Sequence, residues 1–171
     1  NPVALQIPIG QAAHLSGVID LVEMHAVQYT NGDGTERYVT DIPAELREKA
    51  AQKREELVER LADVDDEIAT LYLEDREISA EQLRAVLREA TLRGDLVPVL
   101  AGSALKNKGV QLLLDAVVDY LPSPVDIPAV CGTDPESGKE SECLPDVSEP
   151  TMALVFKIST DPFVGRLAYI R

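Results

Sequence analysis

Aromatic residues, cysteines and long apolar runs are scarce in this sequence, and each shortage excludes a class of structure. Aromatic residues make up 4% of the 171 residues and Trp is absent, so we expect a core of aliphatic side chains. Only Cys131 and Cys143 could supply thiolates, whereas a zinc site needs about four ligands, so we expect two free thiols and no metal site. No run approaches the roughly 18 apolar residues of a membrane span, which argues against a membrane partner.

Basic residues are also in the minority. The chain has 16 Lys and Arg against 30 Asp and Glu, which gives a net charge of -14. Nucleic-acid binding needs a patch of Lys and Arg to neutralise phosphates, so we expect no direct nucleic-acid binding by this chain. The negative charge suits a basic protein partner, and it equally suits a surface that is charged only for solubility.

The sequence also lacks the motifs of the common catalytic sites. There is no G-x-x-x-x-G-K-[ST] phosphate loop and no supported Ser/His/Asp or Cys/His arrangement. His14 lies beside a predicted strand and His25 within one, so we interpret both as structural residues. We therefore expect no catalytic residue in this chain. It begins with Asn1 rather than Met, and we expect it to be part of a longer protein.

The first forty residues have the alternation of β-strands. Residues 3–9, 17–29 and 37–40 are each predicted to form one strand. The sequence Asn31-Gly32-Asp33-Gly34 between the last two favours a hairpin, because both dipeptides tolerate positive φ.

Two helical regions follow. Apolar residues at three- and four-residue steps predict a helix that begins at Pro43 and runs to about residue 71, continuous or broken near residues 62–65. Ser79 and Gln82 form a capping box for a second helix, and Gly94 fits the position that ends it.

The next segment predicts a strand, a loop and a helix. Residues 96–100 form a continuous apolar run typical of a buried parallel strand, although Pro98 is unusual in a central strand. Residues 110–121 form an amphipathic helix that ends before Pro122. Residues 122–149 contain five prolines and are interpreted as a linker. Residues 152–158 and 167–170 are predicted to form a hairpin.

The loop between the strand and the helix is the one segment with a ligand-binding pattern. It reads Gly-Ser-Ala-Leu-Lys-Asn-Lys-Gly over residues 102–109 and follows the carboxyl end of a strand, where open α/β sheets bind ligands. Its small residues let backbone N–H groups approach a ligand closely. From this pattern alone, a plain strand-to-helix turn is equally compatible.

This loop resembles a known motif. GSALKNKGVQ, followed by LLDAVVDYLPSP, is very similar to the last guanine-nucleotide motif of elongation factor G and the helix behind it. Residues 1–10 (NPVALQIPIG), 16–24 (SGVIDLVEM) and 150–171 resemble three further segments of that family in the same order. The resemblance covers essentially the whole chain and is weakest over residues 26–93 and 132–148.

The resemblance implies an α/β fold: the edge of a P-loop-type GTPase domain with an inserted α+β subdomain, followed by the first strands of a β-barrel domain. The implied ranges are a GTPase-domain strand segment (1–14), the insert (15–93), the last strand, guanine-binding loop and helix of the GTPase domain (94–122), a linker (123–149) and the start of the barrel (150–171).

The resemblance also implies roles for three loop residues. The backbone N–H of Ala104 would donate to guanine O6, Ser103 would hold the loop, and Leu105 would pack near the base. Adenine carries an amino donor at that position and would be rejected. The phosphate loop, the Mg²⁺ ligands and the switch regions of the family lie upstream of residue 1. GTP or GDP with Mg²⁺ is therefore expected in the intact protein, and neither useful binding nor hydrolysis by this chain alone.

The implied function is that of a ribosome-dependent GTPase in the cytoplasm, which drives movement of tRNA and mRNA or recycles ribosomes. The implied partner is the ribosomal stalk protein, whose docking helix is basic. The residues that could contact it form an acidic face: Glu55, Glu56, Glu59, Asp63 and Asp66. A merely solvated helix remains the alternative for this face. Alternatives for the protein are a tetracycline-resistance ribosomal protection protein, the GTP-dependent release factor, or a free-standing acidic protein-binding module.

Overall fold

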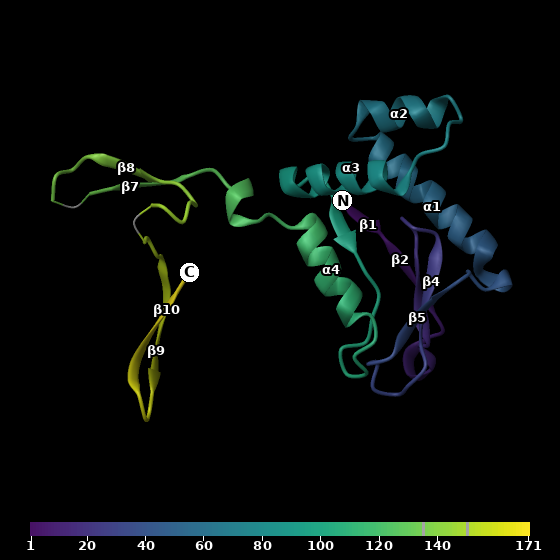
Figure 1. The fold of residues 1–171 in the computed structure, drawn as a ribbon, viewed down its shortest axis with the longest axis horizontal. Coiled ribbons are helices and arrows are strands. Elements are labelled where there is room, and N and C mark those ends of the chain that lie inside the picture. Colours follow the sequence, from purple (N-terminus) through teal and green to yellow (C-terminus); the bar gives the residue numbers. More distant parts are fainter. Residues whose placement is uncertain (135, 150) are drawn as a thin grey trace. The chain divides into compact units, whose positions relative to one another are not determined.

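The computed structural model describes residues 1–134, 136–149 and 151–171, so position 150, the predicted start of the barrel segment, lies outside the described residues. The chain has a mixed α/β fold with small sheets, and it divides into two compact units, Asn1–Leu121 and Pro122–Arg171. The candidate loop and the acidic face both belong to the first unit (Figure 1).

A four-stranded antiparallel sheet forms one layer of the first unit. Its strands follow the order β2 (Gln6–Ile9), β3 (Gly17–Asp20), β4 (His25–Tyr29) and β5 (Arg37–Thr40). The predicted hairpin between the last two strands is confirmed, with Val27 opposite Val39. A short 3₁₀ segment, η1 (Ala12–His14), lies between β2 and β3.

The prediction of a single strand over residues 17–29 is wrong, because the chain turns back between β3 and β4. The Asp20 carboxylate accepts hydrogen bonds from the N–H groups of Val22 (2.8 Å) and Glu23 (2.9 Å), and Met24 has a φ of 56°. A carboxylate that binds backbone N–H groups two and three residues ahead stabilises a tight turn. Leu21 and Val22 in this turn are buried, so the turn carries no polar signature in the sequence.

The predicted strand over residues 3–9 is likewise divided. β1 (Pro2–Ala4) pairs in parallel with β6 (Val97–Val99), whereas β2 belongs to the antiparallel sheet. Leu5 joins the two sheets, since its N–H donates to the carbonyl of Val99 and its carbonyl accepts from Leu21, both at 2.9 Å. The parallel pairing of β6 is confirmed. Its predicted burial is wrong: Val97 is 58% exposed, because no described segment covers that face of the strand.

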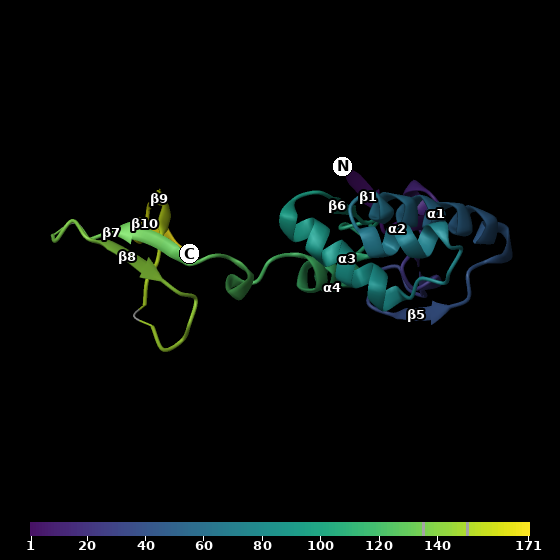
Figure 2. The ribbon, with the colours of Figure 1, turned by 90° about the horizontal axis from the view of Figure 1, so that it is seen from above.

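Three helices follow the four-stranded sheet in the chain. A 3₁₀ turn, η2 (Ala44–Leu46), leads into α1 (Arg47–Ala62), which is followed by α2 (Asp66–Leu73) and α3 (Ala80–Arg93). Helix α1 packs against β1, α3 packs against β6, and α2 packs on α1. Figure 2 shows α1, α2 and α3 clustered in the first unit, with α1 in contact with both of the others. Of the two alternatives for residues 43–71, the helix broken near residues 62–65 is the one found. The capping box of Ser79 and Gln82 and the position of Gly94 at the end of α3 are confirmed. The largest fully buried side chains are aliphatic: Val18, Ile19, Leu21, Leu57, Leu61, Ile68, Leu83 and Leu87.

The last helix of the first unit, α4 (Val110–Tyr120), contacts α3 and follows the candidate loop. Its only buried residue is Tyr120. Leu121, which follows the helix, is exposed, and so are four apolar side chains of α4: Leu113, Leu114, Val117 and Val118.

The second unit contains two hairpins. After η3 (Pro124–Asp126), β7 (Val130–Thr133) pairs with β8 (Glu140–Cys143) inside the range interpreted as a linker. Cys131 and Cys143 lie in these strands as free thiols. The predicted hairpin near the C-terminus is confirmed as β9 (Val155–Asp161) and β10 (Gly165–Ile170).

Candidate functional site

The loop over residues 102–109 is closed by its own backbone. The N–H of Ser103 donates to the carbonyl of Lys108 (2.7 Å), and the N–H of Lys108 donates back to Ser103 (3.0 Å). Between them, the N–H of Asn107 donates to the carbonyl of Ala104 (3.2 Å), and Asn107 has a φ of 52°. This geometry makes the loop a tight hairpin-like turn with Ala104 and Leu105 near its tip.

The tip of the loop has a free donor and a free apolar side chain. Ala104 is exposed, and within the described ranges its N–H has no hydrogen-bond partner. Leu105 is 96% exposed. Ser103 contributes to the closure through its backbone. The loop therefore presents a backbone donor beside an apolar side chain, an arrangement that suits the edge and the face of a planar base.

Two lysines attach the loop to the segment before β3. The ammonium group of Lys106 donates to the carbonyl of Ala13 (2.7 Å), and that of Lys108 donates to the carbonyl of Leu15 (2.8 Å). Their charges are directed to the protein backbone. They support the shape of the loop.

A third attachment reaches the loop from β4. The N–H of Gly109 donates to the hydroxyl oxygen of Tyr29 (2.7 Å), and that hydroxyl donates to Gln111 Oε1 (3.4 Å). The side-chain amide of Gln111 donates in turn to the carbonyl of Gly34 (3.1 Å) in the β4–β5 turn. The sequence pattern did not identify Tyr29, since nothing in its local surroundings distinguishes it from any other strand residue.

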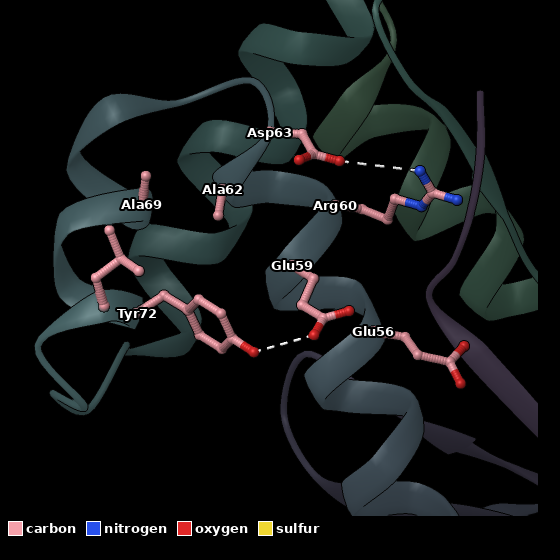
Figure 3. A pocket seen from close by; sticks show the side chains of 8 residues that line it. Glu56, Glu59, Arg60, Ala62, Asp63, Ala69 and Tyr72 are labelled. Carbon is pink, nitrogen blue, oxygen red and sulfur yellow. Dashed lines mark hydrogen bonds and ion pairs between the residues drawn. The ribbon is translucent and has the colours of Figure 1, made fainter.

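A groove of about 580 Å³ lies between α1 and α2. Figure 3 shows Glu56 and Glu59 on α1 and Asp63 just after it, with Tyr72 of α2 directed at Glu59. Leu73, 84% exposed, also lines the groove. Three of the five predicted acidic residues therefore line one concave surface, whereas Glu55 and Asp66 are exposed outside it.

Each of the three groove carboxylates has a partner within the chain. Glu56 pairs with Lys53, and Asp63 lies 3.9 Å from Arg60. Glu59 accepts a hydrogen bond from the hydroxyl of Tyr72 (3.0 Å), and this bond raises the pKa of Tyr72. These pairs are exposed and weak, so they can exchange for a partner's basic groups at little cost.

The described residues offer neither a metal centre nor a membrane-spanning helix. Residues 1–134, 136–149 and 151–171 contain no group of three or more His, Cys, Asp or Glu side chains placed to hold a metal ion. In the same ranges, every helix is too short or too polar to cross a bilayer.

Comparison with known proteins gives matches over the whole chain. No family model matches. The chain is 49% identical over 171 residues to elongation factor G of Thermotoga maritima and 48% identical to that of Thermotoga sp. strain RQ2. It is also similar to a crystal structure of a protein from Thermus thermophilus, with a TM-score of 0.73 and 29% identity over 99% of the chain. The chain spans 25% of the length of the two relatives and 23% of that solved chain.

Proposed function

Because this chain belongs to the elongation factor G family, we propose that it forms part of a ribosome-dependent GTPase that promotes movement of tRNA and mRNA during polypeptide elongation. The observation that carries the proposal is the 49% identity over all 171 residues. A similarity that includes core, loops and surface alike is far more specific than a shared fold.

The first contribution of this chain would be recognition of the guanine base. The N–H of Ala104 would donate to guanine O6, and Leu105 would pack near the base. Two features support this assignment: the exposed N–H without a partner, and the closure of the loop by Ser103 and Lys108. A donor held in a fixed place rejects adenine, whose amino group is itself a donor there.

The chain would provide one edge of the GTPase domain and not its catalytic groups. The proposed ranges are 1–14 and 94–122 for the GTPase domain, 15–93 for the insert, 123–149 for the linker and 150–171 for the start of a barrel domain. The parallel pair β1–β6, followed by the loop and α4, supports the first assignment, since open α/β sheets bind nucleotides beyond such strand ends. GTP or GDP with Mg²⁺ would bind the full-length protein in the cytoplasm, where residues outside this chain perform the phosphoryl transfer.

The second contribution would be a docking surface for the ribosomal stalk protein. The groove between α1 and α2 joins an acidic wall of Glu56, Glu59 and Asp63 to an exposed apolar residue, Leu73. A basic helix with one apolar side chain matches both properties.

The decisive experiment measures GTP hydrolysis by the full-length protein with and without ribosomes. We expect slow hydrolysis alone and an increase of orders of magnitude with ribosomes. Stimulation without mRNA movement in a toeprinting assay would favour a ribosomal protection protein or the release factor. Absence of stimulation would contradict the proposal and favour an acidic binding module. For the chain alone, calorimetry should show no micromolar GDP binding.

A further inference from the structure

Tyr29 is a buried strand residue whose hydroxyl is placed at the end of the loop. Its side chain is 7% exposed, and its hydroxyl oxygen accepts the N–H of Gly109, 80 residues further along the chain. This bond is shielded from water, unlike the exposed bond between the ammonium of Lys106 and the backbone. A hydrogen bond in a buried site holds its geometry more firmly than one that water can replace.

The first turn of α4 cannot cap itself. The residue at the cap position is Gly109, which has no side chain. Three residues later stands Leu112, which cannot reach back to the N–H of Gly109 as Gln82 reaches back to Ser79 in α3. Tyr29 of β4 supplies the missing acceptor for the N–H of Gly109. A hydroxyl oxygen at a helix N-terminus is also favoured by the partial positive charge there.

The other side of the hydroxyl is also bonded. It donates to Gln111, whose amide donates to the carbonyl of Gly34. The network thus joins β4, the β4–β5 turn and the start of α4, and Figure 1 shows that turn and the loop before α4 at the same end of the unit. A polar network with every member paired specifies one arrangement of the segments that it joins.

The position of Gly109 determines the position of the loop tip, because short backbone connections join the two. Lys108 precedes Gly109 and is held to Ser103 by two backbone hydrogen bonds. Ala104 follows Ser103 directly. A shift at Gly109 therefore moves the N–H of Ala104 with respect to anything bound at the loop.

We infer that Tyr29 is a positioning residue for guanine recognition: its hydroxyl fixes the loop so that the N–H of Ala104 meets the oxygen at position 6 of the base. The inference rests on the proposed role of Ala104. Tyr29 would then act on the nucleotide site from the proposed insert, by holding the loop and without touching the nucleotide.

The first test applies hydrogen–deuterium exchange to the chain of residues 1–171. Tyr29→Phe removes one hydroxyl and keeps the buried ring. We expect amide exchange over residues 103–109 to rise about tenfold, with the rest of the sheet unchanged. The matched control is Tyr38→Phe, which removes the hydroxyl that donates to Gln28 on the neighbouring strand and should leave the loop unchanged. Unchanged exchange over residues 103–109 in Tyr29→Phe would overturn the inference.

The second test measures nucleotide affinity of the full-length protein. The two probes are GDP and the 5′-diphosphate of 2-aminopurine riboside, which lacks the oxygen at position 6. We expect Tyr29→Phe to weaken GDP binding about tenfold and to change binding of the analogue less than about twofold. Tyr38→Phe should change neither. Gln111→Met, which removes the second partner of the hydroxyl, should act in the same direction as Tyr29→Phe.

The outcomes separate this inference from the proposed function. Equal binding of the two nucleotides by the unaltered protein would overturn the guanine contact of Ala104, and the inference with it. A preference for GDP that survives Tyr29→Phe intact would overturn the positioning role alone. An equal loss for both nucleotides would show a general structural role and would also overturn the inference.

Discussion

Gly34 in the β4–β5 turn lies directly against Asn107 in the candidate loop. A side chain at Gly34 would collide with the carbonyl oxygens of Asn107 and Lys106, and Gly34 has a φ of 68°, which disfavours other residues. Only glycine permits this approach of two backbones. The β4–β5 turn and the loop are therefore in contact through main-chain atoms as well as through Tyr29 and Gln111.

We expect Gly34→Ala to displace the loop and to lower the free energy of unfolding of the first unit by roughly 1–3 kcal/mol. Both the positive φ and the collision contribute. The measurement is urea unfolding, followed by amide exchange over residues 103–109. Gly32→Ala in the same turn is the control, because a methyl group there would meet no atom within 4 Å. Equal effects of the two substitutions would contradict the contact.

A second prediction concerns Arg54, which joins α1 to two other segments. Its guanidinium donates to the carbonyls of Leu21 (2.6 Å), Val22 (2.7 Å) and Ile78 (3.2 Å). Partial burial lowers the pKa of Arg54, and the carboxylates of Glu23, Asp20 and Glu77 act in the opposite direction. Arg54 therefore supplies hydrogen bonds to carbonyls of the β3–β4 turn and of the segment before α3.

Arg54→Met should lower the free energy of unfolding by about 3 kcal/mol, because it leaves these carbonyls without their charged donor. Arg54→Lys should recover only part of the loss, since an ammonium group lacks the planar fork. Arg60→Met, on an exposed position of the same helix, should cost less than about 0.5 kcal/mol. Urea unfolding monitored by circular dichroism measures all three. Similar losses for Arg54→Met and Arg60→Met would count against this role.

Local sequence signals correctly predicted those elements whose ends are marked by characteristic turn or capping residues. The Asn-Gly and Asp-Gly pairs marked the β4–β5 hairpin, and Ser79, Gln82 and Gly94 marked both ends of α3. The β3–β4 turn was missed because its residues Leu21 and Val22 are apolar and buried, so they continue the pattern of a strand. A carboxylate that closes a turn of this kind has no distinctive spacing.

The site was predictable only in its local part. The loop over residues 102–109 was singled out from its own small residues and its place after a strand, and part of its closure comes from hydrogen bonds inside the loop. Tyr29 was not, since 80 residues separate it from Gly109. For the acidic face, the charge pattern identified Glu56, Glu59 and Asp63, but the groove also needs Tyr72 and Leu73 from α2. The angle between α1 and α2 is a property of packing that no charge pattern contains.

A third prediction is that Tyr120 makes the free energy of unfolding depend on pH in alkaline solution. Burial, together with the nearby carboxylates of Asp20 and Asp119, raises the pKa of Tyr120 from 10.0 to about 12. In the unfolded chain this phenol ionises near pH 10, before it does in the folded protein. Ionisation therefore stabilises the unfolded state first. The contribution of Tyr120 to the stability of the folded protein is lost as pH rises from 10 to 12.

Tyr120→Phe removes this ionisation, so its stability should fall less steeply over the same pH range. The measurement is the urea midpoint of both proteins between pH 8 and pH 12. The difference between the two urea midpoints should be constant below about pH 9. Above that pH it should shift in favour of the variant. Parallel profiles up to pH 12 would show that Tyr120 ionises equally in both states.

The last prediction concerns docking at the groove. The triple substitution of Glu56, Glu59 and Asp63 by Lys should slow association of the full-length protein with the isolated stalk protein about tenfold at low salt. The difference should shrink as ionic strength rises, because salt screens exposed charges. Stopped-flow fluorescence over a series of salt concentrations gives the association rates of the unaltered protein and of the triple variant.

The control for overall charge lies in the second unit. Substitution of Glu136, Glu140 and Glu142 by Lys changes the net charge by the same amount at exposed positions outside the groove. Equal slowing by the two triple variants would mean that net charge alone steers the partner, and no effect of either would mean that the face is only solvated. Leu73→Ser should raise the dissociation rate with little change in association, because an exposed apolar side chain acts after contact is made. A groove that binds through both features requires both outcomes, slower association in the Lys variant and faster dissociation in Leu73→Ser.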